Sequence, residues 1–218
     1  MIDSIYAVCG DGGYGREVMP LARQRVIELG VPLNRLVFVG MKDVDDTLNG
    51  HRVMTHESFL KIPAASRHMT IALASGAARE RLYKQCIQDD VTPWDIQASN
   101  VVRMDGVEIG AGSILSPFVT ITSNVKIGVQ FHANLYSYVA HDCVLGDYVT
   151  FAPAVRCNGN VEIEDHVYIG TNAILRQGSD SKPLRIGKGA VIGMGAVVTK
   201  DVPAGATVVG NPARLFVK

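Results

Sequence analysis

The sequence predicts an α/β domain with a mainly parallel sheet over residues 1–97, followed by an all-β parallel β-helix of six-residue repeats over residues 98–218. Two observations support this division. In the first part, short apolar runs alternate with segments of helical periodicity. In the second part, an apolar residue returns at every sixth position. With 47% hydrophobic residues in 218, the chain can bury a substantial core.

The α/β domain is indicated by three apolar runs. The run "SIYAVC" (4–9) precedes the glycine-rich "GDGGYG" and then "REVMPLARQRVIELG", whose apolar residues recur at helical spacing. The runs "RLVFVG" (35–40) and "MTIALASG" (69–76) are each followed by polar or helical segments. Strands that alternate with helices in this way are typical of a parallel sheet.

A glycine motif lies between the first predicted strand and its helix. Gly10, Gly12 and Gly15 satisfy GxGxxG, and such a turn lets backbone N–H groups approach a phosphate at a helix N-terminus. We therefore expect Gly10, Gly12 and Gly13 to bind substrate, although a turn that needs positive φ would also explain the glycines. Asp43, just beyond the second strand, could bind a ribose hydroxyl or could be a solvated loop residue.

The six-residue period defines the second domain. It fits short strands joined by tight corners, with two residues of each hexad, the first and the fifth, facing a continuous interior. The register is interrupted once, where "RQGSDSKPLR" adds five residues before Ile186, and we expect an extruded loop at 178–185. The first positions of the hexads are all apolar: Ile109, Leu115, Ile121, Ile127, Ala133, Val139, Leu145, Phe151, Cys157, Ile163, Ile169 and Leu175.

This repeat resembles that of the hexapeptide-repeat acyltransferases, whose left-handed β-helix has three hexads in each turn and forms homotrimers. A small N-terminal α/β domain in front of the repeat resembles the bacterial nucleotide-sugar N-acetyltransferases. The resemblance implies that the α/β domain binds a nucleotide-linked dideoxy amino sugar and that the coil binds acetyl-CoA. It also implies active sites between subunits, attack on the thioester without an acyl-enzyme, and a role in surface-polysaccharide synthesis such as that of O-antigen.

The stretch "SYVAHDCVLGDYV" (137–149) carries the candidate catalytic residues. His141 is the third residue of its hexad and should point outward, where most histidines have no special role. The resemblance implies that His141 is the general base, because related enzymes have a His, an acidic residue and a Cys at this point. Imidazole, with an ordinary pKa of about 6.5, can accept the proton of an attacking amine. Asp142 could orient the ring, and the N–H of Gly159, eighteen residues later, could bind the oxyanion.

The resemblance also implies further binding residues. An asparagine at the place of Asn134 contacts the sugar in similar enzymes. Some relatives have a second histidine in the turn after the catalytic one, and Thr150 stands at the corresponding place here. The residues expected to bind acetyl-CoA are Thr171, Gly193, Gly195, Ala196 and Arg214.

Charge and cysteine content exclude several other classes. Lys plus Arg and Asp plus Glu both number 21, so no cationic surface is expected for nucleic acid or for an anionic membrane. The four scattered cysteines and the N-terminal sequence favour a cytoplasmic protein with reduced thiols. Cys143 and Cys157 fall at inward positions, which argues against a cysteine nucleophile. We expect the other histidines to lie at the surface: His51, His56, His68, His132 and His166.

Three alternatives remain open at this point. The nucleotide could be UDP rather than GDP, because a glycine turn recognises phosphates and not the base. A trimeric β-helix hydrolyase would need three histidine ligands for zinc, but His132 and His141 are nine residues apart and would not stack. We therefore expect no metal. A non-catalytic trimeric scaffold that binds a nucleotide would release no thiol from acetyl-CoA.

Overall fold

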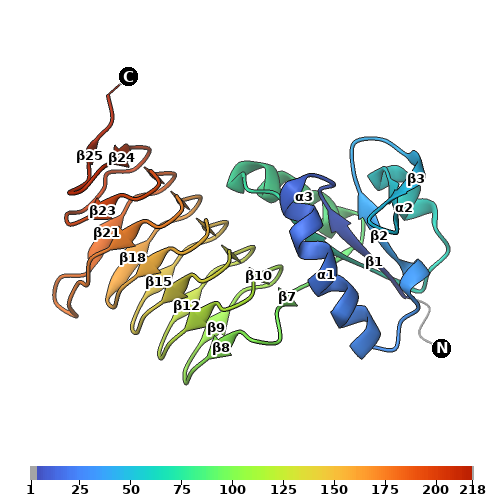
Figure 1. Ribbon diagram of the computed structural model, residues 1–218, viewed down its shortest axis with the longest axis horizontal. Helices are drawn as coiled ribbons and strands as arrows, with labels where there is room; N and C mark the ends of the chain where they lie inside the picture. Colours follow the sequence, from blue (N-terminus) through green and yellow to red (C-terminus); the bar gives the residue numbers. More distant parts are fainter. Residues whose placement is uncertain (1–3, 218) are drawn as a thin grey trace. The chain divides into compact units, whose positions relative to one another are not determined.

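The computed structural model describes residues 4–217, without the side chains of residues 44–46. The chain divides into two compact units, Met1–Ile96 and Gln97–Lys218 (Figure 1). Each unit has its own cluster of buried apolar side chains. Among residues 4–217, no helix is long and apolar enough to cross a membrane.

The first unit is built on one sheet in the order β3-β4-β2-β1-β5-β6. Strand β1 pairs in parallel with β2 on one side and β5 on the other, and β3 joins the edge in antiparallel orientation. The chain therefore changes direction across the sheet between β1 and β5. The elements are β1 (Ser4–Cys9), α1 (Gly13–Glu28), a 3-10 turn (Leu33–Arg35), β2 (Leu36–Val39), β3 (Val44–Leu48), β4 (His51–Met54), α2 (His56–Lys61), β5 (Ser66–Ile71), α3 (Gly76–Gln88) and β6 (Thr92–Pro93).

Two glycines allow α1 to begin close to the end of β1. Gly10 has φ +112°, a backbone conformation that side chains disfavour. A Cβ on Gly15 would lie only 1.8 Å from the carbonyl oxygen of Gly10. Any larger residue at position 15 would push the first turn of α1 away from the turn that leads into it.

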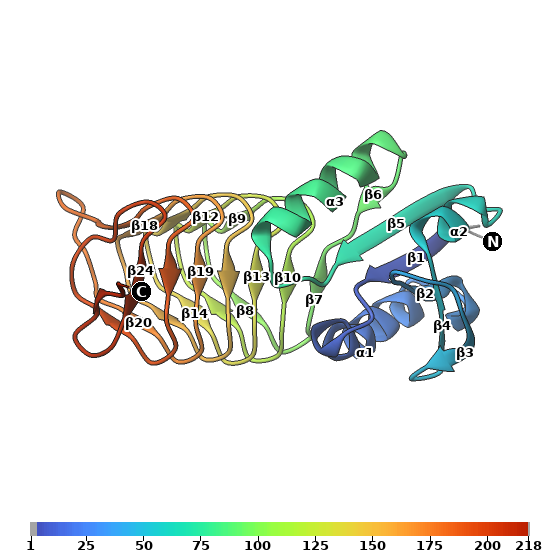
Figure 2. The same cartoon turned by 90° about the horizontal axis from the view of Figure 1, so that it is seen from above.

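The second unit is a coil whose complete turn has eighteen residues. Strand partners are eighteen residues apart on all three walls, as in Lys126↔Val144, His132↔Thr150 and Tyr138↔Arg156 (Figure 2). One wall contains β7 (Ile96–Gln97), β10 (Ile114–Leu115), β13 (His132–Ala133), β16 (Thr150–Phe151), β19 (Tyr168–Ile169), β22 (Val191–Ile192), β24 (Thr207–Val209) and β25 (Arg214–Leu215). The second contains β8 (Val102–Arg103), β11 (Thr120–Ile121), β14 (Tyr138–Val139), β17 (Arg156–Cys157), β20 (Ile174–Leu175) and β23 (Val197–Val198). The third contains β9 (Glu108–Ile109), β12 (Lys126–Ile127), β15 (Val144–Leu145), β18 (Val161–Ile163) and β21 (Leu184–Ile186).

The interior of the coil is filled by the residues that the period assigns to it. From Leu115 to Leu175, the first positions of the hexads are at most 7% exposed, and the aliphatic side chains at the fifth positions are completely buried. After Leu175 the spacing between partners grows from 18 to 23 residues, as in Ile163↔Ile186. The five additional residues leave the coil as a loop that is closed by two hydrogen bonds between the backbones of Ser179 and Lys182.

From Phe118 to Asn172, the fourth residue of each hexad adopts the left-handed conformation, with φ near +60°. Its N–H donates to the carbonyl one turn earlier, which joins the corners of successive turns. The "His141 corner" consists of Ser123–Asn124, His141–Asp142, Gly159–Asn160 and Gln177–Gly178, linked by bonds of 2.9–3.1 Å. The "Asn134 corner" contains Pro117–Phe118, Asn134–Tyr136, Pro153–Ala154, Thr171–Asn172 and Gly193–Gly195, and the third, the "Asp147 corner", contains Val129–Gln130, Asp147–Tyr148 and Asp165–His166.

The expectation that the remaining histidines lie at the surface is wrong for two of them. His132 is completely buried, and His51 is 5% exposed. His51 is buried because its ring nitrogens contact the Leu36 carbonyl oxygen and the Arg23 guanidinium, at 3.1 Å each. His56 is half-buried and contacts Asp89 at 2.7 Å. The position of a residue in the hexad shows whether its side chain points out of the coil, but not whether other residues then cover that side chain.

Candidate active site

His141 and Asp142 form a hydrogen-bonded pair on the outside of the coil. The distance from His141 Nδ1 to Asp142 Oδ2 is 2.7 Å, and both side chains are a little less than half exposed. The other carboxylate oxygen, Oδ1, accepts a hydrogen bond of 3.2 Å from Asn124 Nδ2. The hydrogen bonds from His141 and then from Asn124 lower the pKa of Asp142 below its ordinary value. Asp142 is therefore a carboxylate at neutral pH, and Nδ1 of the neutral ring carries the proton that it donates.

Asp142 differs from other aspartates that lie at corners of the coil. At the Asp147 corner, the carboxylate of Asp147 accepts from the N–H of Val129 at 2.8 Å, and that of Asp165 accepts from the N–H of Asp147 at 3.0 Å. Those carboxylates satisfy backbone groups and so stabilise the coil. Asp142 instead hydrogen-bonds two side chains, which is an arrangement suited to holding an imidazole in one orientation.

Gly159 lies directly against the imidazole of His141. A Cβ at position 159 would be 2.6 Å from both Cε1 and Nε2 of that ring. The glycine therefore provides the space in which the ring lies. None of the hydrogen bonds found among residues 4–217 uses the Gly159 N–H, whereas the N–H groups of Val129 and Asp147, at the same hexad position, are capped by carboxylates. The structure thus brings His141, Asp142 and Gly159 together. The N–H of Gly159 is an available hydrogen-bond donor there, and Nε2 of His141 is an available acceptor.

The two cysteines near this corner lie inside the coil. Cys143 and Cys157 are both completely buried, with their sulfur atoms 4.0 Å apart. Contact with Cys143 and complete burial raise the pKa of Cys157 well above its ordinary value. The hydrogen bond with Cys157 lowers the pKa of Cys143, but complete burial keeps both thiols away from a substrate outside the coil. These two cysteines therefore offer no alternative to a histidine at the surface.

Asn134 is on another corner of the coil from His141. Its Oδ1 accepts from the N–H of Leu135 at 2.7 Å, which closes the turn around the side chain. Within one chain, a wall of the coil separates the Asn134 corner from the His141 corner. The structure does not bring Asn134 and His141 together in a single subunit.

The residues expected to bind acetyl-CoA are only partly gathered. The N–H of Gly195 donates to the carbonyl of Thr171 at 2.8 Å, and the N–H of Ala196 donates to the carbonyl of Gly193. These four residues therefore lie together at the C-terminal end of the Asn134 corner. The side chain of Ala196 is completely buried, so only its backbone could contact a ligand. Arg214 is exposed on β25, where it lines a hollow of about 580 Å³ with Lys200, Val202 and Val208 among its other lining residues.

In the α/β unit, Gly12 and Gly13 form the N-terminus of α1. A Cβ on either would meet no other atom, so neither is required by packing, whereas Gly10 lies against the carbonyl of Ala72. This turn packs against the loop after β5, residues 72–75. The sequence did not indicate that these residues lie beside the glycine motif. Ligands of open parallel sheets bind where the strand order changes direction, here at the carboxyl ends of β1 and β5. The completely buried Arg79 holds this loop by donating to the carbonyls of Leu73 and Ala74.

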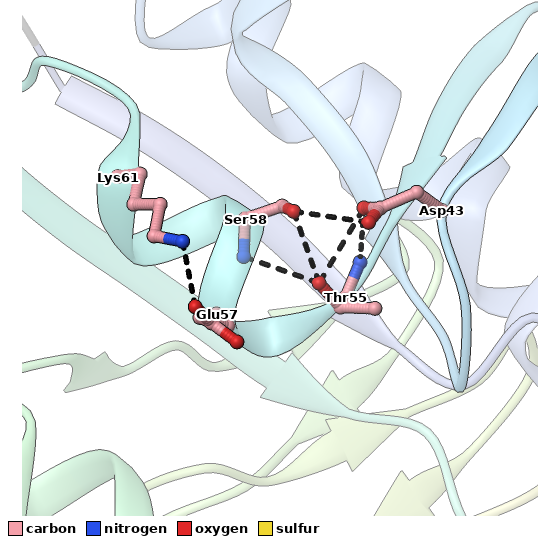
Figure 3. A network of polar contacts seen from close by, with 5 residues as sticks. All are labelled: Asp43, Thr55, Glu57, Ser58 and Lys61. Carbon is pink, nitrogen blue, oxygen red and sulfur yellow. Dashed lines mark hydrogen bonds and ion pairs between the residues drawn. The ribbon is translucent and has the colours of Figure 1, made fainter.

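Asp43 has a role in the structure of the α/β unit (Figure 3). Its Oδ1 accepts from the N–H of Thr55 at 2.8 Å, and its Oδ2 accepts from the hydroxyl of Ser58 at 3.1 Å. Thr55 is the N-cap residue of α2 and accepts from the N–H of Ser58. The bonds from Thr55 and Ser58 lower the pKa of Asp43. Asp43 therefore stabilises the start of α2, and the ribose contact stays a prediction.

Comparison with known proteins identifies the family. No protein-family model matches the chain. The GDP-perosamine N-acetyltransferase of Escherichia coli O157:H7 is 48% identical over 211 residues, which cover 97% of this chain and 96% of that protein. The chain belongs to the nucleotide-sugar N-acetyltransferases. It is therefore an acetyl-CoA-dependent sugar N-acetyltransferase.

Two solved structures resemble this N-acetyltransferase along their whole length. WeeI from Acinetobacter baumannii AYE is 52% identical and superposes with a TM-score of 0.94, covering 98% of this chain and all of that one. The acetyltransferase domain of PglB from Neisseria gonorrhoeae FA1090, in complex with acetyl coenzyme A, is 25% identical with a TM-score of 0.85, covering 99% of this chain and all of that one. Membership of this enzyme family decides against the hydrolyase and the non-catalytic scaffold.

Two further features of this N-acetyltransferase concern a metal site and a second histidine near His141. Among residues 4–217, no group of three or more His, Cys, Asp or Glu residues is arranged to hold a metal ion. Thr150, at the place where some relatives have a second histidine, is a buried residue of β16. Thr150 therefore supplies no second imidazole beside His141.

Proposed function

We propose that this enzyme transfers the acetyl group of acetyl-CoA to the 4-amino group of a GDP-linked dideoxy amino sugar, GDP-perosamine. The observation that carries the proposal is the 48% identity, over nearly the whole chain, to a protein named for that activity. The proposal extends to both units, because the similarity includes the α/β unit as well as the coil.

In the proposed mechanism, the sugar amine attacks the thioester carbonyl directly. The nitrogen–carbon bond forms while Nε2 of His141 accepts the proton that the nitrogen loses. Asp142 keeps Nδ1 protonated and stabilises the imidazolium through their 2.7 Å hydrogen bond. The carbon–sulfur bond of the tetrahedral intermediate then breaks, and the imidazolium returns its proton to the departing thiolate of CoA.

Gly159 contributes in two ways to this mechanism. Its missing side chain leaves room for the imidazole, and its N–H would donate to the oxyanion of the tetrahedral intermediate. A backbone N–H is suited to this because its position is set by the corner before the reaction begins. The removal of one oxyanion donor from an enzyme typically reduces kcat by about 10²–10³.

The remaining expectations complete the proposal. The coil is left-handed, and three chains assemble so that Asn134 of one subunit faces His141 of another and contacts the sugar. Gly10, Gly12 and Gly13, with Asp43, bind the nucleotide part. Acetyl-CoA contacts the backbones of Thr171, Gly193, Gly195 and Ala196, and Arg214 pairs with its phosphates. The enzyme acts in the cytoplasm in surface-polysaccharide synthesis.

A UDP-linked 4-amino sugar is the alternative acceptor. A UDP-N-acetylglucosamine O-acyltransferase of Alkalilimnicola ehrlichii is 34% identical over 115 residues, which cover half of the present chain and 43% of that protein. A glycine turn recognises phosphates and not the base, so thiol release with both kinds of sugar has to decide between the two nucleotides.

The test is thiol release from acetyl-CoA by the purified protein with GDP- and UDP-linked 4-amino sugars, measured beside His141→Asn. We expect rapid release with GDP-perosamine and the loss of most of that rate in the variant at neutral pH. Equal rates in the two proteins would remove His141 from the mechanism. Faster release with a UDP-linked sugar would reassign the substrate.

A further inference from the structure

The hydrogen-bonded pair at the His141 corner has a third member. Asn124 lies eighteen residues before Asp142, at the same position one turn earlier, and both have the left-handed backbone conformation, with φ 59° and 57°. Asn124 Nδ2 donates to Asp142 Oδ1 at 3.2 Å, while Asp142 Oδ2 contacts His141 Nδ1 at 2.7 Å. Each carboxylate oxygen thus has a different partner, and the three side chains form a chain that ends at the imidazole.

The orientation of the Asn124 amide follows from its surroundings. A Cβ at Gly106, one further turn back, would lie 2.8 Å from Asn124 Oδ1. The oxygen end of the amide is therefore backed by Gly106, and the NH₂ end faces Asp142. Because a carboxylate can only accept, the amide nitrogen is the end that can bond to it.

A free aspartate in this place could turn about its side-chain bonds. Both Asp142 and His141 are nearly half exposed, so water competes for each carboxylate oxygen. With Oδ1 held by Asn124, Oδ2 stays on the Nδ1 side of the imidazole. The ring then keeps its Nδ1 proton, and Nε2 remains unprotonated beside Gly159, where the proposed mechanism needs a base.

We propose that Asn124 is a positioning residue for the transfer reaction, which acts on His141 through Asp142. This inference rests on the proposed function, because it takes His141 to be the base. It makes Asn124 part of the active site without any contact with substrate.

The test is a double-mutant cycle with Asn124→Gly and Asp142→Asn, read as kcat and KM for both substrates. Glycine adopts positive φ readily, so Asn124→Gly removes the side chain without straining the corner. We expect kcat to fall about tenfold in Asn124→Gly with little change in KM, which corresponds to the loss of one hydrogen bond to a charged group. In the double variant, kcat should be no lower than in Asp142→Asn alone, because Asn124 then has no carboxylate to hold.

A matched control is Asn49→Gly, which makes the same change at an exposed residue of the α/β unit with φ 50° and should leave kcat unchanged. Losses that multiply in the double variant, or an unchanged kcat in Asn124→Gly, would overturn the inference. His141→Asn, measured in parallel, separates the two proposals. If that variant keeps its activity, the general base itself is wrong. If His141→Asn is inactive while the double-mutant cycle shows no coupling between Asn124 and Asp142, only the role of Asn124 is wrong.

Discussion

Residue 159 determines where the imidazole of His141 can lie. Gly159 and His141 occupy successive turns of one corner, and the ring fills the space that a side chain at 159 would take. Gly159 has no positive φ, so its own backbone does not require a glycine. A glycine is needed there because a side chain would overlap the His141 ring. In the proposed mechanism, the missing side chain at 159 therefore matters for the position of the base.

Gly159→Ala should therefore remove activity with little effect on the fold. The new Cβ would lie 2.6 Å from the ring, so the imidazole must move away from its position beside Asp142. Because misplacement of a reacting group by about 1 Å can cost about 10²-fold, we expect kcat to fall by about that factor while the thermal midpoint changes by only a few degrees.

His141→Asn in combination with Gly159→Ala is the control for this result. Without the imidazole, the methyl group at 159 has nothing to displace, so it should add little to the loss caused by His141→Asn. A further large loss in the double variant would show that alanine acts at the oxyanion or at the substrate and not on the ring. An active Gly159→Ala variant would show that the ring has room elsewhere.

Helix α2 depends on residues at two places in the sequence. The helix has only six residues, His56–Lys61, and its first turn is held by Thr55 and by Asp43, which lies between β2 and β3. Since short helices receive little stabilisation from their own hydrogen bonds, these contacts carry much of its stability. Figure 3 shows the carboxylate of Asp43 facing both Thr55 and Ser58.

Asp43→Asn should lower the free energy of unfolding at pH 7. The pKa of Asp43 is lowered in the folded protein, so its carboxylate contributes stability above the ordinary aspartate pKa of about 3.9 and loses that contribution as the pH falls through the folded value. The difference between wild type and variant, measured by urea unfolding, should therefore be present at pH 7 and shrink below about pH 4. A constant difference across this range would contradict the assignment. The KM for the nucleotide sugar, measured in the same variant, tests the ribose contact separately.

The loop at residues 179–183 is an insertion that the coil does not need. The hydrogen bonds between Ser179 and Lys182 are internal to the loop, and the partner spacing without these five residues would again be eighteen. Deletion of 179–183 should leave the circular dichroism spectrum unchanged and the thermal midpoint within a few degrees, since long surface insertions cost little. Unfolding at a much lower temperature would show that the loop supports the turns on either side.

The sequence predicts different elements unequally well, for physical reasons. The inward positions of the coil could be predicted because side-chain direction is a local property of a repeating backbone. The same period would also have found Asn124, which lies one turn before Asp142. The role of Asp43 and the burial of His51 and His132 could not be found in this way. The contacts of Asp43 and His51 join segments that no period relates. The period also does not show what covers an outward residue such as His132, and α2 is too short for its helical spacing to be recognised.

At the scale of the whole molecule, the separation of Asn134 from His141 is the main constraint. The two residues lie on different corners of one coil, so a site that uses both must combine two subunits. In a closed ring of identical subunits, one corner of each chain faces a different corner of the next. The proposed homotrimer would therefore contain three equivalent sites, each made from two chains.

This arrangement predicts complementation between two inactive variants. His141→Asn and Asn134→Ala, each prepared alone, should have little activity, because every site in either trimer lacks one residue. When equal amounts are unfolded together and refolded, a site is intact where an Asn134→Ala subunit supplies the histidine and a His141→Asn subunit supplies the asparagine. Random assembly places these two in the required order at about a quarter of the sites, so about a quarter of the wild-type rate should return. Mixing the two folded variants without exchange of subunits should restore nothing, and a refolded mixture that stays inactive would mean that each site is built from a single chain.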